Sequence, residues 1–234
     1  QMCIRDSGYS CSGRVIEVGA EIDDLRVGDC VACAGMGYAS HAEINFVPRN
    51  LVARVPEGLA LEEAAYATVG SIALQGVRVL ELTLGETVVV VGLGLIGLLA
   101  IQIVEAHGGR AIGVDLDPER LAMARNLGLT RVLSRNEDVS QSVLSWSRGV
   151  GADAVLVTAA APTNDPLLLA VEVLRKRGRI GVVGSVPLEV PRRSFYEKEL
   201  QLRMSTSYGP GRYDPVSYTH LRAHETRHDL VCRL

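Results

Sequence analysis

The sequence predicts an α/β fold in which a β-rich segment precedes a doubly wound parallel sheet. Three observations carry this prediction. Short β-rich runs bounded by glycine fill residues 8–55, strands and helices alternate from Leu84 onward, and a glycine-rich turn joins the first strand of the second half to its helix. The later strands are apolar throughout, as expected when helices cover both faces of a parallel sheet of the Rossmann type.

The β-rich segment contains three runs that read as strands. They are GRVIEVG, GDCVACAG and SHAEINFVP, the last of which ends at Pro48. The pattern then changes to helix in VPEGLALEEAAYATVGSIALQGVRVL, where Pro56 and Gly58 mark the break. Glu62 and Glu63 lie in an early helical turn, where the helix dipole favours acidic side chains.

The second half alternates regularly between the two element types. Asp117 and Pro118 have the residue types of a helix N-cap and first helical position, and Gly128 follows that helix. The expected order is strand TVVVVG, helix LIGLLAIQIVEAHG, strand RAIGVD, helix DPERLAMARNLG, strand RVLS, helix NEDVSQSVLSWSRG, strand DAVLVTAA, helix DPLLLAVEVLRKRG and strand RIGVVGS.

Composition excludes several classes of function. The net charge of −3 and an aromatic content of 4% give no reason to expect a nucleic-acid partner. The apolar stretch TVVVVGLGLIGLLAIQIV reaches membrane length, but its glycines and β-branched start favour a buried strand that turns into a helix. No signal peptide is visible and the five cysteines are unevenly spaced, so we expect a cytoplasmic protein without a disulfide framework or membrane contact.

The motif GLGLIG, residues 92–97, predicts a dinucleotide site. Gly92 permits a tight turn, Gly94 lets the backbone approach a pyrophosphate, and Gly97 lets the helix pack closely on the strand. The amides of Leu95 and Ile96 belong to the helix N-terminus, where unpaired N–H groups favour phosphate. Alone, the pattern also fits a purely structural turn.

A carboxylate after the next strand supports the ligand interpretation. Asp115 follows Gly97 by about 18 residues, near the spacing expected for an acid that accepts both hydroxyl groups of the adenosine ribose. This acid would repel a 2′-phosphate, which favours NAD over NADP, and Arg120 could reach the same ribose or a phosphate. The alternative for Asp115 is a helix cap, but Asp117 fills that role. A methyltransferase loop usually carries an acid before its first glycine, where this chain has valine.

With these residues in view, the chain resembles the medium-chain dehydrogenase/reductase family, the superfamily of zinc-type alcohol dehydrogenases. The segments that carry the resemblance are GRVIEVG, VGDCV, AEINFVPRNLVARVPEGLALEEAA, VVVVGLGLIGLLAIQI and GVDLDPERLAMARNLG. The match runs from Gly8 to Pro215, and SFYEKELQLRMSTSYGPGRYDP resembles a bacterial subgroup often fused to a second oxidoreductase domain. The resemblance implies a partial GroES-like catalytic domain before the cofactor domain.

The resemblance also implies hydride transfer between nicotinamide and an alcohol or carbonyl substrate. The nicotinamide is expected over the carboxyl ends of the strands. The backbone there makes five residues candidate contacts, although ordinary strand-to-loop turns would also explain them. These residues are Thr158, Ala159, Val183, Gly184 and Ser185.

Two departures from the family pattern affect the expected chemistry. Zinc-binding members have Gly-His-Glu where this chain has Gly8-Tyr9-Ser10, and a second ligand position aligns near Val69. Cys30 and Cys33 lack a second cysteine pair, so we expect core thiols and no metal. The family's barrel also begins upstream and closes after the cofactor domain, so we expect a fragment without turnover of its own.

The proton donor is not identified by the sequence. Tyr9, Tyr38, His41 and Tyr66 lie in or near the catalytic segment, and each also suits a structural role. Two alternatives to an NAD-dependent enzyme remain: an NADPH-dependent quinone or enoyl reductase, and a module that senses the dinucleotide without reacting. The segment LQLRMSTS could form the edge strand of a homodimer, as is common in the family.

The two ends resemble translated adapter sequence. QMCIRDS and VSYTHLRAHETRHDLVCRL have no counterpart in the family, so the HETRH segment, although it matches a zinc-protease motif, is expected to be accidental. The expected parts are a non-native segment over residues 1–7, a partial GroES-like domain over 8–60, linking helices over 61–84, an NAD-binding domain over 85–215 and a non-native tail over 216–234.

Overall fold

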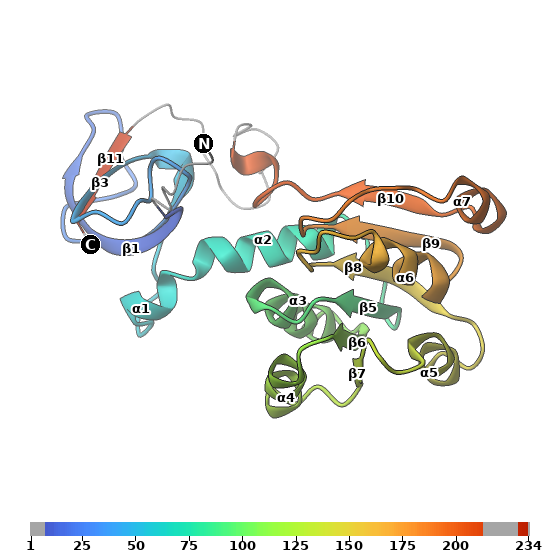
Figure 1. Cartoon of the computed structure of the whole chain (residues 1–234). Helices are drawn as coiled ribbons and strands as arrows, with labels where there is room; N and C mark the ends of the chain where they lie inside the picture. The colour runs from blue at the N-terminus through green and yellow to red at the C-terminus, as the bar shows by residue number, and fades with distance from the viewer. Residues whose placement is uncertain (1–7, 213–228, 234) are drawn as a thin grey trace. The chain divides into compact units, whose positions relative to one another are not determined.

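A computed structural model describes residues 8–212 and 229–233 of the chain, the last five through their backbone (Figure 1). These residues form two compact units. The first, the β unit, holds residues 8–71, 208–212 and 229–233, and the second, the α/β unit, holds Ile72–Ser207. Within the described residues, every helix is too short or too polar to cross a membrane.

The β unit is built on an antiparallel sheet whose strand order is β3-β11-β1-β2-β4. Residues of β1 alternate between buried and less buried positions, so that one face of the strand, including Cys11 and Val15, packs into a core with Val31 and Val47. The elements are β1 (Ser10–Val18), β2 (Cys30–Ala34), β3 (Ile44–Pro48), η1 (Arg49–Leu51), β4 (Val52–Arg54), α1 (Leu61–Ala64), η2 (Pro210–Arg212) and β11 (Asp229–Arg233). Helix α2 (Ala67–Arg78) crosses the division between the units.

Strand β11 falls in the segment that is predicted from the sequence to be a non-native tail. Its backbone pairs with β1 and β3, with Val231 opposite Phe46 and Glu17. The HETRH segment and the predicted N-terminal scar lie outside the described residues. Backbone pairing does not test where a segment comes from, so the non-native tail stays a prediction.

The α/β unit contains a six-stranded parallel sheet, which confirms the predicted fold class. Its strand order is β10-β9-β8-β5-β6-β7, so the chain runs from β5 outward on one side and then returns to add β8 on the other. The elements are β5 (Thr87–Val91), α3 (Leu95–Ala106), β6 (Arg110–Asp115), α4 (Pro118–Asn126), β7 (Val132–Ser134), α5 (Val139–Trp146), β8 (Ala152–Val157), α6 (Asp165–Val173), β9 (Leu174–Val182), α7 (Arg192–Lys198) and β10 (Gln201–Met204). The reversal places a switch point between β5 and β8, where ligands of such sheets bind at the carboxyl ends.

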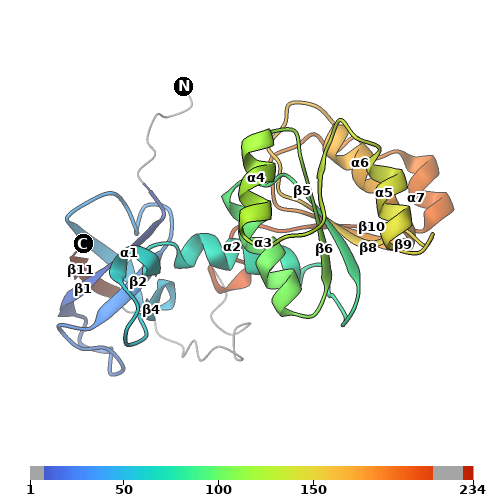
Figure 2. The same ribbon diagram turned by 90° about the horizontal axis from the view of Figure 1, so that it is seen from below.

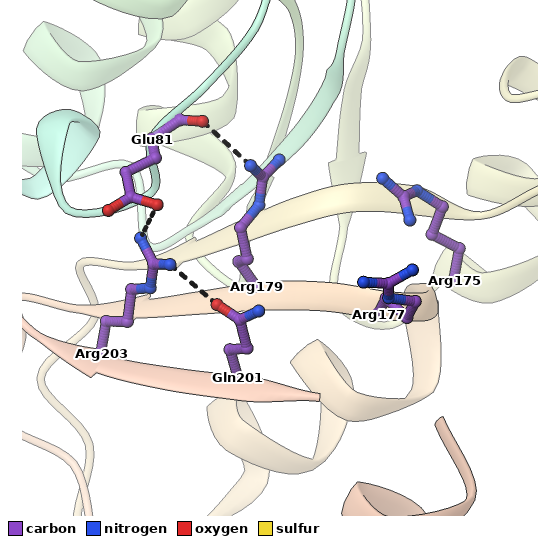
Figure 3. A pocket seen from close by; sticks show the side chains of 6 residues that line it. All are labelled: Glu81, Arg175, Arg177, Arg179, Gln201 and Arg203. Carbon is purple, nitrogen blue, oxygen red and sulfur yellow. Dashed lines mark hydrogen bonds and ion pairs between the residues drawn. The ribbon is translucent and has the colours of Figure 1, made fainter. Parts of the chain in front are cut away.

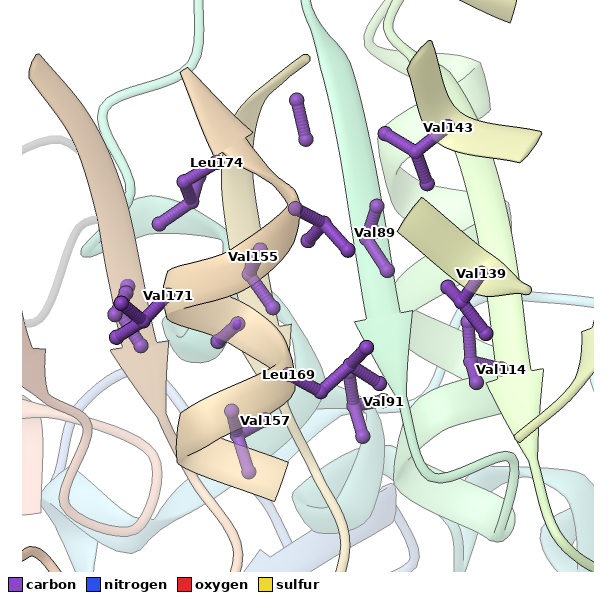
Figure 4. Close-up of a cluster of buried hydrophobic side chains, with 14 of the residues drawn as sticks. Val89, Val91, Val114, Val139, Val143, Val155, Val157, Leu169, Val171 and Leu174 are labelled. Carbon is purple, nitrogen blue, oxygen red and sulfur yellow. The ribbon is translucent and has the colours of Figure 1, made fainter. Parts of the chain in front are cut away.

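Helices cover both faces of this sheet (Figure 2). Strand β5 is buried along its whole length and divides its valines between the faces: Val88 and Val90 pack with α3 and α4, whereas Val89 and Val91 pack with α5 and α6. Figure 4 shows the second of these clusters, with α6 lying over β8 and β9. This continuous burial explains why the strands read as unbroken apolar runs.

One predicted element is wrong in its extent. The sequence predicts a helix that continues through LRKRG to Gly178, but α6 ends at Val173 and Leu174 already belongs to β9. The reason lies outside the segment, because Lys198 Nζ donates to the carbonyl oxygens of Val171 and Leu174 at 2.7 and 2.8 Å and so takes up acceptors at the helix end. Burial among these groups lowers the pKa of Lys198, against the opposing effect of Glu172.

Two neighbouring leucines on α6 give a matched test of the core. Leu169 is 1% exposed and Leu168 is 48% exposed. We expect Leu169→Ala to lower the free energy of unfolding by about 2–5 kcal/mol, because it opens a cavity in the core. Leu168→Ala should change it by less than about 1 kcal/mol. Urea denaturation measures both; equal losses for the two variants would contradict the described packing.

Candidate functional site

The glycine loop connects β5 to α3 and is held by contacts on two sides. Gly92 has φ +100°, which favours glycine, and its amide donates to the Val114 carbonyl oxygen at 2.8 Å. A methyl group built on Gly92 would lie 2.6 Å from the Ala159 nitrogen. The first glycine therefore serves both a turn and a close approach to the end of β8.

Gly97 allows the helix to approach its own loop. A methyl carbon at this position would lie 1.9 Å from the Gly92 carbonyl oxygen and 2.9 Å from Thr158 Oγ1. Thr158 itself donates its hydroxyl to that carbonyl at 2.6 Å. The roles given to Gly92 and Gly97 as turn and packing residues thus agree with the structure.

Gly94 differs from the other two glycines, because neither its backbone angles nor its packing requires a glycine at this position. Its φ of −70° and ψ of −173° are open to any residue, and a methyl group there would meet no atom within 4 Å. The Leu98 amide makes the first bond of the helix, to the Gly94 carbonyl, and no side chain caps this helix start. The amides of Leu95, Ile96 and Gly97 precede that bond and lack intrahelical acceptors, so this open backbone suits an anionic ligand.

Asp115 ends β6 beside this loop and is 8% exposed. Its Oδ2 accepts the Leu93 amide at 2.6 Å, and its Oδ1 accepts the Asp117 amide at 2.9 Å. The acid therefore ties the glycine loop to the start of α4. A carboxylate offers about four lone-pair positions, so about two remain for a ligand. Asp117, as predicted, caps α4 by accepting the Glu119 amide at 2.9 Å.

Arg120 projects from the first turn of α4 toward both acids. Its Nη1 lies 3.6 Å from Asp115 Oδ2 and its Nε lies 3.5 Å from Asp117 Oδ2. The Arg120 side chain is more than half exposed, so these contacts leave it accessible to a ligand. The sequence predicts that Arg120 lies near Asp115, and the structure brings the two side chains together.

The ends of β8 and β9 adjoin the loop, as the topology requires. The Thr158 and Ala159 amides donate to the Val91 carbonyl oxygen at 2.9 and 3.0 Å, and a methyl group on Gly184 would lie 1.9 Å from the Ala159 carbonyl oxygen. Packing thus explains the identity of Gly184. Val183 and Gly184 donate their amides to the Val157 carbonyl oxygen. Contact of these residues with nicotinamide stays a prediction.

The sequence predicts Thr158 as a cofactor contact but gives no sign that its hydroxyl supports the glycine loop. The Thr158 hydroxyl spans the ends of two neighbouring strands by bonding the carbonyl oxygens of Val91 and Gly92 at 3.2 and 2.6 Å. A threonine at the end of a strand carries no local signal for this role. It follows from the pairing of β5 with β8, which places residues 66 positions apart side by side.

The candidate proton donors all belong to the β unit. The Tyr9 carbonyl accepts the Gly35 amide at 3.0 Å, and the rings of Tyr9, Tyr38 and Tyr66 are exposed. His41 packs against Gly8, where a methyl group would lie 2.8 Å from its Cδ2. None of the four is assigned a catalytic role by these contacts.

The described donor set does not fit zinc. Cys30 and Cys33 are three residues apart on β2, so their side chains point to opposite faces of the strand. Cys33 is buried in the β-unit core, and Ser10 and Tyr9 stand where the family pattern has Glu and His. Among the described residues, no three His, Cys, Asp or Glu side chains gather as a metal site requires.

Comparison with known proteins identifies the family and fold to which this site belongs. A family model described as zinc-binding dehydrogenase matches residues 96–219. Sorbitol dehydrogenase of Bacillus subtilis is 27% identical over 218 residues, which cover 79% of this chain and 61% of that protein. The chain thus spans less than two thirds of this relative's length.

Two solved structures extend the comparison. An alcohol dehydrogenase from Thermus sp. ATN1 has a TM-score of 0.75 and 28% identity, covering 86% of this chain and 68% of its own. A mycobacterial protein complexed with NADPH has a TM-score of 0.75 and 26% identity, covering 88% of this chain and 66% of its own.

Proposed function

Because the chain belongs to the zinc-binding dehydrogenase family of medium-chain dehydrogenases/reductases, we propose that it binds NAD(H) and serves hydride transfer. The substrate class is a small alcohol or its carbonyl counterpart. The relatives named as sorbitol and alcohol dehydrogenases support this class. The cofactor site is the glycine loop between β5 and α3 together with Asp115.

The open backbone at Gly94 carries the proposal. Packing within the protein explains Gly92 and Gly97 but leaves Gly94 unexplained, since a side chain there would enter free space. A ligand that lies against this backbone would account for the glycine. The neighbouring amides and the positive end of α3 favour its pyrophosphate.

The chain's residues would hold the cofactor in three places. The amides at the start of α3 bind the pyrophosphate, and Asp115 accepts the ribose hydroxyls through the lone pairs that Leu93 and Asp117 leave unused. The backbone at the ends of β8 and β9 lines the nicotinamide position. Bound NAD supplies a nicotinamide ring that accepts or gives a hydride at C4, and the protein orients it and excludes water.

Arg120 favours a second candidate, an NADPH-dependent reductase. Its guanidinium lies within 3.6 Å of Asp115 Oδ2 and would attract a 2′-phosphate that Asp115 repels. The mycobacterial structure complexed with NADPH is consistent with such a preference. The more buried carboxylate, fixed by two amides, supports NADH as the preferred form.

Calorimetry with the purified chain tests the proposal. We expect NADH to bind at least about tenfold more tightly than NADPH, a difference of about 1.4 kcal/mol. Tighter binding of NADPH would favour the second candidate. No heat of binding from either cofactor, for a chain that is folded by circular dichroism, would sink both.

We also propose that β10 forms a homodimer edge. This strand pairs with β9 and ends the parallel sheet, so its other side carries unpaired backbone groups within the described part of the sheet. Light scattering is expected to give about twice the chain mass at micromolar concentration. A monomer at every concentration would exclude this arrangement.

A further inference from the structure

An arginine-lined hollow lies at the amino ends of strands β9 and β10 of the parallel sheet (Figure 3). Arg175, Arg177 and Arg179 come from β9, Gln201 and Arg203 come from β10, and Glu81 lies shortly before β5. In a parallel sheet all strands start at one edge and end at the other. These residues occupy the starts of β9 and β10, whereas the glycine loop follows the end of β5, so the hollow is separate from the proposed cofactor site.

The lining of the hollow suits a charged ligand better than an apolar one. Its volume is about 320 Å³, near the lower end of ligand cavities, and all six lining residues are polar or charged. Four guanidinium groups face one carboxylate. The acids that pair with Arg175 and Arg179, Asp153 and Glu86, do not line it.

Two of the arginines are held rigidly. Arg179 Nη2 lies 2.5 Å from Glu86 Oε2, and its Nη1 donates to the Glu81 carbonyl at 2.9 Å. Arg203 Nη1 donates to the Val79 carbonyl and lies 2.8 Å from Glu81 Oε2. Side chains that are already ordered lose little conformational entropy when a ligand binds.

The other guanidinium groups keep donors in reserve. Arg175 uses Nε toward Asp153 and Nη1 toward the Lys176 carbonyl. The ion pair of Arg177 is a 3.8 Å contact from Nε to Glu199, and its side chain is 79% exposed. Arg179, one of the rigid pair, also has an Nε that is buried without a hydrogen-bond partner. Guanidinium forks with unspent N–H groups suit the oxygens of a phosphate.

The backbone around the hollow departs from regular structure. Ala152 pairs with Leu174 and Ala154 with Arg179, so β9 has three more residues than β8 between these pairs. Arg175 and Arg177 belong to this irregular segment of β9. Within the described residues, five non-glycine residues have positive φ, and three of them are Arg177, its partner Glu199, and Glu81. Such irregularities concentrate at binding sites.

We propose that this hollow binds a small, multiply charged phosphate compound, with Arg175 and Arg177 as its main ligands and Arg179 and Arg203 as a rigid base. The polar and charged lining residues and the unused guanidinium donors favour a free phosphoryl group over a hydrophobic molecule. This site is independent of the proposed dehydrogenase activity.

Inorganic pyrophosphate is the probe, titrated into the full chain by calorimetry at ionic strength matched with NaCl. Arg177→Gln should weaken its binding by about tenfold, the equivalent of one charge-assisted contact. Arg193→Gln removes the same charge from α7, at a side chain 89% exposed and away from the hollow, and should change binding by less than about twofold.

Gly94→Ala separates the hollow from the glycine loop. If pyrophosphate binds in the hollow, its affinity should survive Gly94→Ala. Loss of binding in Gly94→Ala with retention in Arg177→Gln would overturn the proposal, as would equal losses in Arg177→Gln and Arg193→Gln or no binding to the wild-type chain. Failure of the proposed NADH site would show separately, in the NADH titration.

Discussion

Gly97→Ala is expected to destabilise the α/β unit and to abolish measurable NADH binding. The added carbon would lie 1.9 Å from the Gly92 carbonyl oxygen, so the loop backbone must move. The β5–β6 and β5–β8 pairings and the Thr158 hydroxyl hold that backbone. We expect the free energy of unfolding to fall by about 3 kcal/mol, the upper part of the range for overpacked positions. Urea denaturation followed by circular dichroism measures it.

Gly94→Ala is the matched control for this prediction. A methyl group at Gly94 meets no protein atom, and its backbone angles suit alanine. Stability should therefore stay within about 1 kcal/mol of wild type, with any gain arising from the less flexible unfolded chain. NADH affinity should nevertheless fall at least about tenfold, because the methyl group would occupy the approach of the pyrophosphate. Unchanged NADH affinity in Gly94→Ala would remove the main support for the proposed cofactor site.

Asp115→Asn is expected to reverse or erase the preference for NADH over NADPH. The substitution removes the charge that repels a 2′-phosphate and leaves Arg120 nearby. It also replaces one acceptor of the ribose hydroxyls, a charged hydrogen bond worth about 1.5–3 kcal/mol, or roughly 10- to 100-fold in NADH affinity. Stability should fall as well, by about 1–3 kcal/mol, because an amide NH2 group would face either the Leu93 or the Asp117 N–H.

Asp117→Asn provides the control for charge. It removes the same charge two residues away, and asparagine caps a helix about as well as aspartate. We expect this variant to keep the wild-type ratio of NADH to NADPH affinity. The ratio, measured by calorimetry, is insensitive to a general loss of folded protein. A similar change of the ratio in both variants would show that Asp115 has no specific contact with the ribose.

The two proposed ligand sites lie at opposite ends of the strands of the same sheet. At the carboxyl ends of the strands, backbone amides and one acid face the proposed dinucleotide. At the amino ends of β9 and β10, guanidinium groups face the proposed phosphate compound. Near the start of β9, Lys198 donates to the Leu174 carbonyl oxygen, at the point where α6 ends and the strand begins.

Much of the α/β unit follows from local patterns. The alternation of apolar runs with amphipathic segments predicts its strands and most of its helices, because burial on both faces needs unbroken apolar strands. The glycine loop and the Asp117 cap are also local, since a turn, a close approach or a cap depends on residues a few positions apart. The spacing of Asp115 from the loop is set by one helix and one strand, so it too could be predicted.

Contacts between distant segments were decided by the tertiary structure alone. The hydrogen bond from Thr158 to the Gly92 carbonyl depends on β8 pairing with β5, and the bond from the Leu93 amide to Asp115 depends on β6 lying at the other side of the same strand. The end of α6 at Val173 depends on Lys198, and the arginine-lined hollow gathers residues from three segments between Glu81 and Arg203. The physical reason is that strand order and side-chain neighbours are set by the shared core that the whole chain buries, and no local window of sequence contains that core.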